Sequence, residues 1–117
     1  MEHSKRLLIK EGDFLLREGE QSDELFVLMS GCLKVYKKLG RNSTEIGTIL
    51  PGQTVGEMSF LDKAPRSGDV KAFKESTVGV IEREKFDKFL DDLPPWFKKL
   101  QETLLKRLRE ANQKIII

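Results

Sequence analysis

The chain has 117 residues, with 21 Lys and Arg against 19 Asp and Glu, which gives a net charge of +2. This length fits one domain. Because the positive and negative charges nearly balance, the composition gives no reason to expect nucleic acid or a membrane as a partner. One cysteine, Cys32, and one histidine, His3, exclude an intrachain disulfide framework and a zinc site of clustered cysteines and histidines. No apolar run approaches the roughly 20 residues of a spanning helix, so we expect a cytoplasmic protein. With a single histidine we also expect no metal.

Short apolar runs separated by glycine-bearing turns fill the first two thirds of the chain, a spacing typical of all-β domains. The expected strands are residues 6–10, 14–17, 24–29, 32–38, 44–50, 70–74 and 77–82. Chain reversals are expected at Gly12, Gly19, Gly31 and Gly40. Pro51-Gly52 fits a type II turn, because proline presets φ and glycine supplies a positive φ. The pattern predicts a mainly antiparallel, jelly-roll-like β-roll.

After residue 82 the hydrophobic period changes to that of helices. One helical face carries Phe86, Phe89, Leu90 and Leu93, and the pair Pro94-Pro95 ends this first helix. Pro95 suits the first turn of a second, long amphipathic helix. Its apolar stripe comprises Phe97, Leu100, Leu104, Leu108, Ala111 and Ile115. We therefore expect one domain in two parts, a roll with the first helix over 1–94 and a helix with its tail over 95–117.

The segment 55–69 interrupts the strand pattern and carries the candidate site. A single helical turn over 57–61 would leave its first amide hydrogens without internal partners, and such a cluster attracts an anion. Gly56 has no Cβ, so a ligand can approach its backbone closely. Pro65 stiffens the run that presents Arg66 toward the same turn. A guanidinium has a forked set of donors that suits phosphate oxygens, so the segment predicts a phosphate site.

Two neighbouring side chains refine this prediction. A carboxylate only accepts hydrogen bonds, so Glu57 beside a phosphate needs a donor such as a ribose hydroxyl. Ser67 could add a hydroxyl to the site. The alternative for Arg66 is a surface ion pair with Asp62 or Asp69, which would contribute little stability. The alternative for Glu57 is a carboxylate favoured at a helix start.

With these residues at this spacing, the chain resembles the cyclic nucleotide-binding domain family of bacterial catabolite activators, kinase regulatory subunits and cyclic nucleotide-gated channels. The resemblance runs from about Lys5 to the end of the second helix. The matching residues are Gly12, Gly19, Gly31, Gly56, Glu57, Pro65 and Arg66. A family of this kind consists of sensors, so the resemblance implies a receptor or regulatory module and no enzyme.

The resemblance also implies a role for each site residue. It places the ribose 2′-hydroxyl on Glu57. It places the phosphate among the backbone of Gly56, Met58 and Ser59, and the exocyclic oxygens on Arg66 and Ser67. Leu105 and Leu108 of the second helix are expected to cover the base when the helices move. The Ser67 hydroxyl after the arginine does not separate cAMP from cGMP. We expect cAMP because it is the commoner bacterial signal, and cGMP is the alternative ligand.

The alternative is a ligand-free interaction or dimerisation module on the same fold. Strong binders of the family usually carry alanine where Gly68 stands and a small neutral residue where Asp69 stands, and both departures favour this alternative. The second helix has a short heptad pattern, so a homodimer through it and simple packing on the roll are both open. No helix-turn-helix follows, so we expect no DNA binding by this chain alone. Either the chain is a fragment of a larger regulator, or it acts on an output protein in trans.

Overall fold

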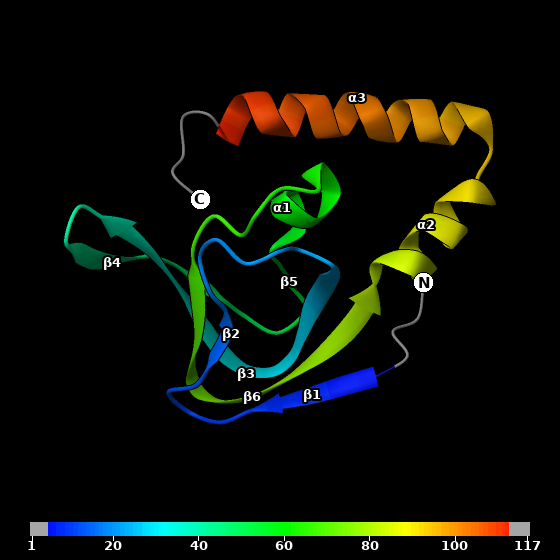
Figure 1. Cartoon of the computed structure of the whole chain (residues 1–117). Coiled ribbons are helices and arrows are strands. Elements are labelled where there is room, and N and C mark those ends of the chain that lie inside the picture. The colour runs from blue at the N-terminus through cyan, green and yellow to red at the C-terminus, as the bar shows by residue number, and fades with distance from the viewer. Residues whose placement is uncertain (1–4, 113–117) are drawn as a thin grey trace.

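The computed structural model describes residues 5–112 and shows a β-roll followed by two helices (Figure 1). Its elements are β1 (Lys5–Ile9), β2 (Phe14–Leu16), β3 (Glu24–Leu39), β4 (Asn42–Ile49), β5 (Thr54–Val55), α1 (Glu57–Asp62), β6 (Asp69–Glu82), α2 (Arg83–Asp91) and α3 (Pro95–Asn112). The described strands pair antiparallel in the order β1-β6-β3-β4, with β2 on β6 and β5 on β3. The predicted fold class is confirmed.

β3 and β6 are each one long strand where the sequence pattern predicts two. The predicted chain reversal at Gly31 is wrong, because pairing between β3 and β6 continues past it through irregular registers. Gly31 has a φ of 99°, and a Cβ at this position would collide with Ser76 of β6. The Ser76 hydroxyl accepts a hydrogen bond from the amide of Cys32 at 3.1 Å. Bulges of this kind bend a strand without ending it, so the long strands turn the corner of the roll.

The turn predicted at Pro51-Gly52 is confirmed. Gly52 has a φ of 92°, and the amide of Gln53 donates to the carbonyl of Leu50 at 3.1 Å. This turn leads into β5, a strand that the sequence pattern did not predict because two residues are too few to show a repeated apolar alternation. It places Thr54 and Val55 directly before Gly56 of the candidate site.

Two apolar clusters hold the domain together. The larger fills the roll and includes Leu28, Leu33 and Val78, all fully buried. The smaller joins α1 and α2 to the roll through Phe60, whose ring meets that of Phe86 edge to face with centroids 5.1 Å apart. Because burying a phenylalanine stabilises a fold by roughly 1.5–3 kcal/mol, Phe60 fixes the short helix α1 against both neighbours.

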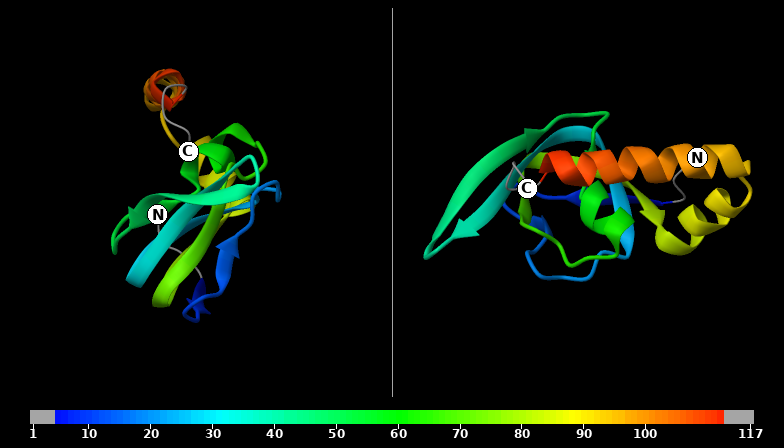
Figure 2. Two further views of the ribbon diagram at one scale, coloured as in Figure 1. Left: turned by 90° about the vertical axis from the view of Figure 1, so that its left-hand side faces the viewer. Right: turned by 90° about the horizontal axis from the view of Figure 1, so that it is seen from above.

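α3 lies across the top of the molecule, above α1 and apart from the roll (Figures 1 and 2). Its predicted start at Pro95 is confirmed. Three leucines of its predicted apolar stripe are about half exposed: Leu100 (47%), Leu104 (54%) and Leu108 (44%). The stripe therefore does not pack on the roll in this structure, and its last predicted member, Ile115, lies outside the described residues. Within residues 5–112, no helix is long and apolar enough to cross a membrane.

Candidate ligand-binding site

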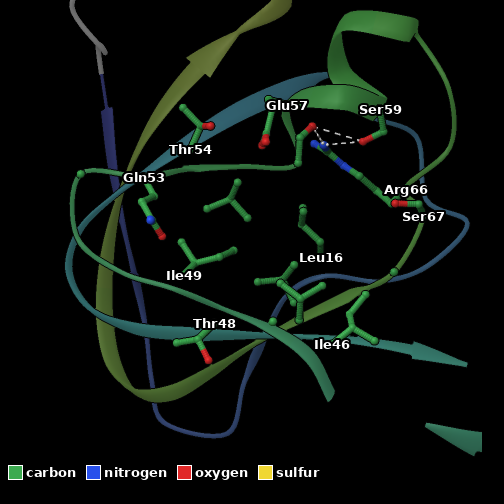
Figure 3. A pocket seen from close by; sticks show the side chains of 17 residues that line it. Leu16, Ile46, Thr48, Ile49, Gln53, Thr54, Glu57, Ser59, Arg66 and Ser67 are labelled. Atoms are coloured by element: carbon green, nitrogen blue, oxygen red, sulfur yellow. Dashed lines mark hydrogen bonds between the residues drawn. The ribbon is translucent and has the colours of Figure 1, made fainter. Parts of the chain in front are cut away.

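A cavity of about 590 Å³ lies between α1 and the inner face of the roll (Figure 3). Its volume is in the range of roughly 300–1,000 Å³ that is usual for small-ligand sites. The apolar part of its wall comes from strands and includes Leu16, Val35, Ile46, Ile49, Val55 and Val70. The polar part includes Gln53, Thr54, Glu57, Ser59, Arg66 and Ser67. Four of the polar residues are those the sequence singled out.

Gly56 is the hinge between β5 and α1. It has a φ of 71° and a ψ of 27°, in the left-handed region, and its carbonyl accepts the first helical hydrogen bond from Phe60. A Cβ on Gly56 would also collide with the guanidinium of Arg66. Glycine is therefore required here for its backbone conformation and for the close approach of Arg66.

Arg66 is buried, with 4% of its surface exposed, and its guanidinium points at the start of α1. Nη1 donates to the carbonyl of Gly56 at 2.9 Å and to the hydroxyl of Ser59 at 3.1 Å. Nη2 donates to the carbonyl of Glu24 on β3 at 2.5 Å. Nε is buried and has no partner. The predicted meeting of Arg66 and the turn after Gly56 is thus present in the structure.

No carboxylate forms an ion pair with Arg66 among the described residues. Asp62 instead contacts Arg109 of α3, and Asp69 lies 3.7 Å from Nε of Arg17. The alternative interpretation of Arg66 as half of a surface ion pair is therefore wrong. Burial lowers the pKa of Arg66, and the more distant carboxylates of Glu24 and Glu20 offset part of this effect.

Glu57 is the first residue of α1 and points into the cavity (Figure 3). In the described part of the chain, its carboxylate has no hydrogen bond and no ion pair. Because a carboxylate can only accept, it is available to a hydroxyl donor on a ligand. Its position also fits the alternative, a carboxylate at a helix start, and the two roles do not conflict.

The remaining predicted site residues divide into two groups. Ser59 and Ser67 line the cavity, and the carbonyl of Ser67 accepts from Nζ of Lys37 at 2.7 Å. Met58 is not among the lining residues, and neither are Leu105 and Leu108 on α3. The lid role of the two leucines stays a prediction.

Sequence reasoning missed the apolar lining and the anchors of Arg66. Leu16 and Ile49 lie at inward positions of their strands, which the alternation of apolar residues could have shown. The Glu24 carbonyl carries no sequence signal, because any residue type has one. Its position depends only on the path of β3.

Gly68 departs from the family pattern for a visible reason. A Cβ at this position would lie 2.7 Å from the backbone carbonyl oxygen of Tyr36 on β3. The alanine usual in the family therefore does not fit between the segment 55–69 and β3 in this chain. The departure reflects close backbone packing and does not by itself argue against a ligand.

Comparison with known proteins agrees with this geometry. The family model described as "Cyclic nucleotide-binding domain" matches residues 6–92. The chain belongs to the cyclic nucleotide-binding domain family. This domain is 27% identical over 113 residues to the Cyclic AMP receptor protein of Thermus thermophilus. The alignment covers 96% of this chain and 52% of the relative. It is 30% identical over 82 residues to a cAMP-dependent protein kinase type II regulatory subunit of Drosophila melanogaster, covering 70% of this chain and 21% of that one.

Solved structures give the same result. The Thermus thermophilus Catabolite Activator Protein matches the domain with a TM-score of 0.76 at 28% identity, covering 95% of this chain and 53% of that one. The EAL enzyme Bd1971 in its cAMP-bound form has a TM-score of 0.78 at 21% identity, over 94% of this chain and 29% of that one, and shows the fold alone. The domain spans about half the length of the bacterial regulators it matches.

Proposed function

We propose that this domain is a regulatory receptor for a cyclic nucleotide, with cAMP preferred and cGMP possible, and that it is not an enzyme. The observation that carries the proposal is Arg66, a buried cation without an ion-pair partner in the described chain, in the wall of a cavity. Buried charges in proteins are normally paired. A ligand with one phosphate charge would supply the missing anion.

The other cavity residues favour a ribose and a base beside that phosphate. Glu57 offers an unpaired acceptor for a sugar hydroxyl. β4 contributes the apolar Ile46 and Ile49 to the wall, together with the polar Thr48, and the two isoleucines suit the flat face of a base (Figure 3). The name of one relative supports this ligand class, since the chain is similar to a Cyclic AMP receptor protein.

We also propose that ligand binding moves the C-terminal helices. α1 contacts both of them: Phe60 meets Phe86 of α2, and Asp62 contacts Arg109 of α3. Arg83, the first residue of α2, donates to the carbonyl of Phe60 at 2.6 Å and lies 4.2 Å from the centre of its ring. A shift of α1 toward a bound phosphate would therefore act on α2 at its start and on α3 near its end.

Isothermal titration calorimetry with cAMP and cGMP tests the receptor function. We expect one site per chain, with adenosine failing to bind because it lacks the phosphate. Arg66→Leu should weaken cAMP binding at least about 100-fold, since hydrogen bonds to charged groups contribute roughly 1.5–3 kcal/mol each. Arg6→Leu, which removes an exposed arginine of β1, is the matched control and should bind normally. Absence of heat at millimolar nucleotide would contradict the proposal.

The exposed stripe of α3 favours a second candidate, a dimerisation module. Leu104 and Leu108 are four residues apart on one helical face, and both are about half exposed. A partner helix would bury them, as a homodimer or with an output protein. Sedimentation with and without cAMP separates the candidates: a ligand-free module has one association state in both, whereas a receptor coupled to α3 changes its association or its shape.

A further inference from the structure

Asp69, the first residue of β6, is buried, with 6% of its surface exposed. Its Oδ1 accepts a hydrogen bond from the amide of Glu18 at 2.7 Å, although the two residues are 51 positions apart. It forms no ion pair with Arg66 among the described residues, and its counter-charge is Arg17, with Nε at 3.7 Å. A buried carboxylate with these partners fixes the turn between β2 and β3.

That turn, residues 17–20, holds the backbone of Arg66 on both sides. The amide of Gly19 donates to the carbonyl of Arg66 at 2.9 Å, and the amide of Arg66 donates to the carbonyl of Glu20 at 2.8 Å. The turn is closed internally by the amide of Arg17, which donates to Oε1 of Glu20 at 2.6 Å. Both main-chain groups of Arg66 therefore depend on where this turn lies.

The cation on the turn is itself fixed. The guanidinium of Arg17 lies 3.9 Å from the centre of the Phe14 ring and contacts Asp69. Cation–π contact and charge pairing together restrict a side chain that is otherwise half exposed. Asp69 thus receives a neutralising charge without drawing on Arg66.

We propose that Asp69 is a positioning residue for Arg66, acting through the 17–20 turn. Removing the carboxylate takes the side-chain acceptor from the amide of Glu18, in a part-buried hydrogen bond, so the turn loses its anchor on β6 and is free to shift. The backbone of Arg66 then shifts with it, and the guanidinium loses its alignment with Gly56 and Ser59. The effect on affinity rests on the proposed function, whereas the effect on Arg66 itself does not.

The variants Asp69→Ala and Asp69→Asn test the proposal by calorimetry with cAMP. We expect Asp69→Ala to weaken binding about tenfold, since the phosphate-binding group is displaced. Asp69→Asn keeps an oxygen acceptor for the Glu18 amide and should stay within about threefold of wild type. Glu20→Ala removes the acceptor of the Arg17 amide in the same turn and should also weaken binding. This variant replaces Asp69→Ala as the test if Asp69→Ala does not fold. Asp13→Ala removes one exposed carboxylate of the same roll and serves as the control.

A second readout observes Arg66 without any ligand. The buried Nε–H of Arg66 should give a distinct side-chain signal in ¹H–¹⁵N NMR spectra, assigned by its absence in Arg66→Lys. We expect this signal to shift or broaden in Asp69→Ala and to return in Asp69→Asn. An unchanged signal and unchanged affinity in folded Asp69→Ala would overturn the positioning role. A changed signal in a protein that binds no nucleotide would uphold it while refuting the proposed function.

Discussion

Arg66 is a buried cation whose partners in this structure are the oxygens of uncharged groups, two carbonyls and one hydroxyl. Such oxygens satisfy donors but do not neutralise charge, so the site retains an affinity for an anion. Burial lowers the pKa of Arg66, and a bound phosphate would act in the opposite direction. Arg66, which holds the start of α1 through Gly56 and Ser59, is thus also the residue that would bind the phosphate of a ligand.

The contribution of Glu57 to ligand affinity can be measured by a double cycle that combines a substitution in the protein with a change in the ligand. We expect Glu57→Gln to weaken cAMP binding about tenfold, because the acceptor for the ribose hydroxyl loses its charge. The ligand 2′-deoxy-cAMP should lose a similar factor with the wild-type protein. Combining the two should cost little more than either alone, since one interaction is removed twice. Additive losses in calorimetry would show that Glu57 does not contact that hydroxyl.

At Gly68 we predict that the family's usual residue harms this chain. Gly68→Ala would bring a Cβ within 2.7 Å of the Tyr36 carbonyl and should destabilise the fold by about 1–3 kcal/mol. Gly47→Ala is the matched control, because a Cβ there meets nothing within 4 Å. Urea unfolding of both variants gives the comparison. Equal stability of the two would refute the packing argument.

At the scale of elements, α1 connects the cavity to both C-terminal helices. The contact between Asp62 of α1 and Arg109 is the one ion pair of α3 within the described chain. An exposed pair of this kind contributes at most about 1 kcal/mol, enough to bias a movable helix without locking it. It is therefore suited to hold α3 above α1 until a ligand changes the position of α1.

We predict that Asp62→Asn increases the mobility of α3 with little effect on overall stability. Spin labels at Lys38 of β3 and Glu102 of α3, in a Cys32→Ser background, should give a broader distance distribution in the variant. The swapped pair Asp62→Arg with Arg109→Asp should restore the narrow one. Glu45→Gln, which breaks the exposed pair with Lys34, is the control. Identical distributions in all four proteins would show that the contact does not hold the helix.

At the scale of the whole molecule, the sequence predicted the order and type of the elements better than the long-range contacts that bend and connect them. Local signals were sufficient for the β-roll, for the helix after Pro95 and for the meeting of Gly56 with Arg66, because each depends on residue type and spacing. The continuity of β3 past Gly31 depends on Ser76, which lies 45 positions away, so no local pattern could show it. The same holds for Asp69, whose partner Glu18 belongs to another turn.

The most direct test of the central claim is the NMR signal of the Arg66 Nε–H during titration with cAMP. If the guanidinium receives the cyclic phosphate, one equivalent of cAMP should shift this signal, and adenosine should leave it unchanged. The shift should saturate at the same ligand concentration as the calorimetric heat. Saturable binding of cAMP with an unmoved Arg66 signal would contradict the account.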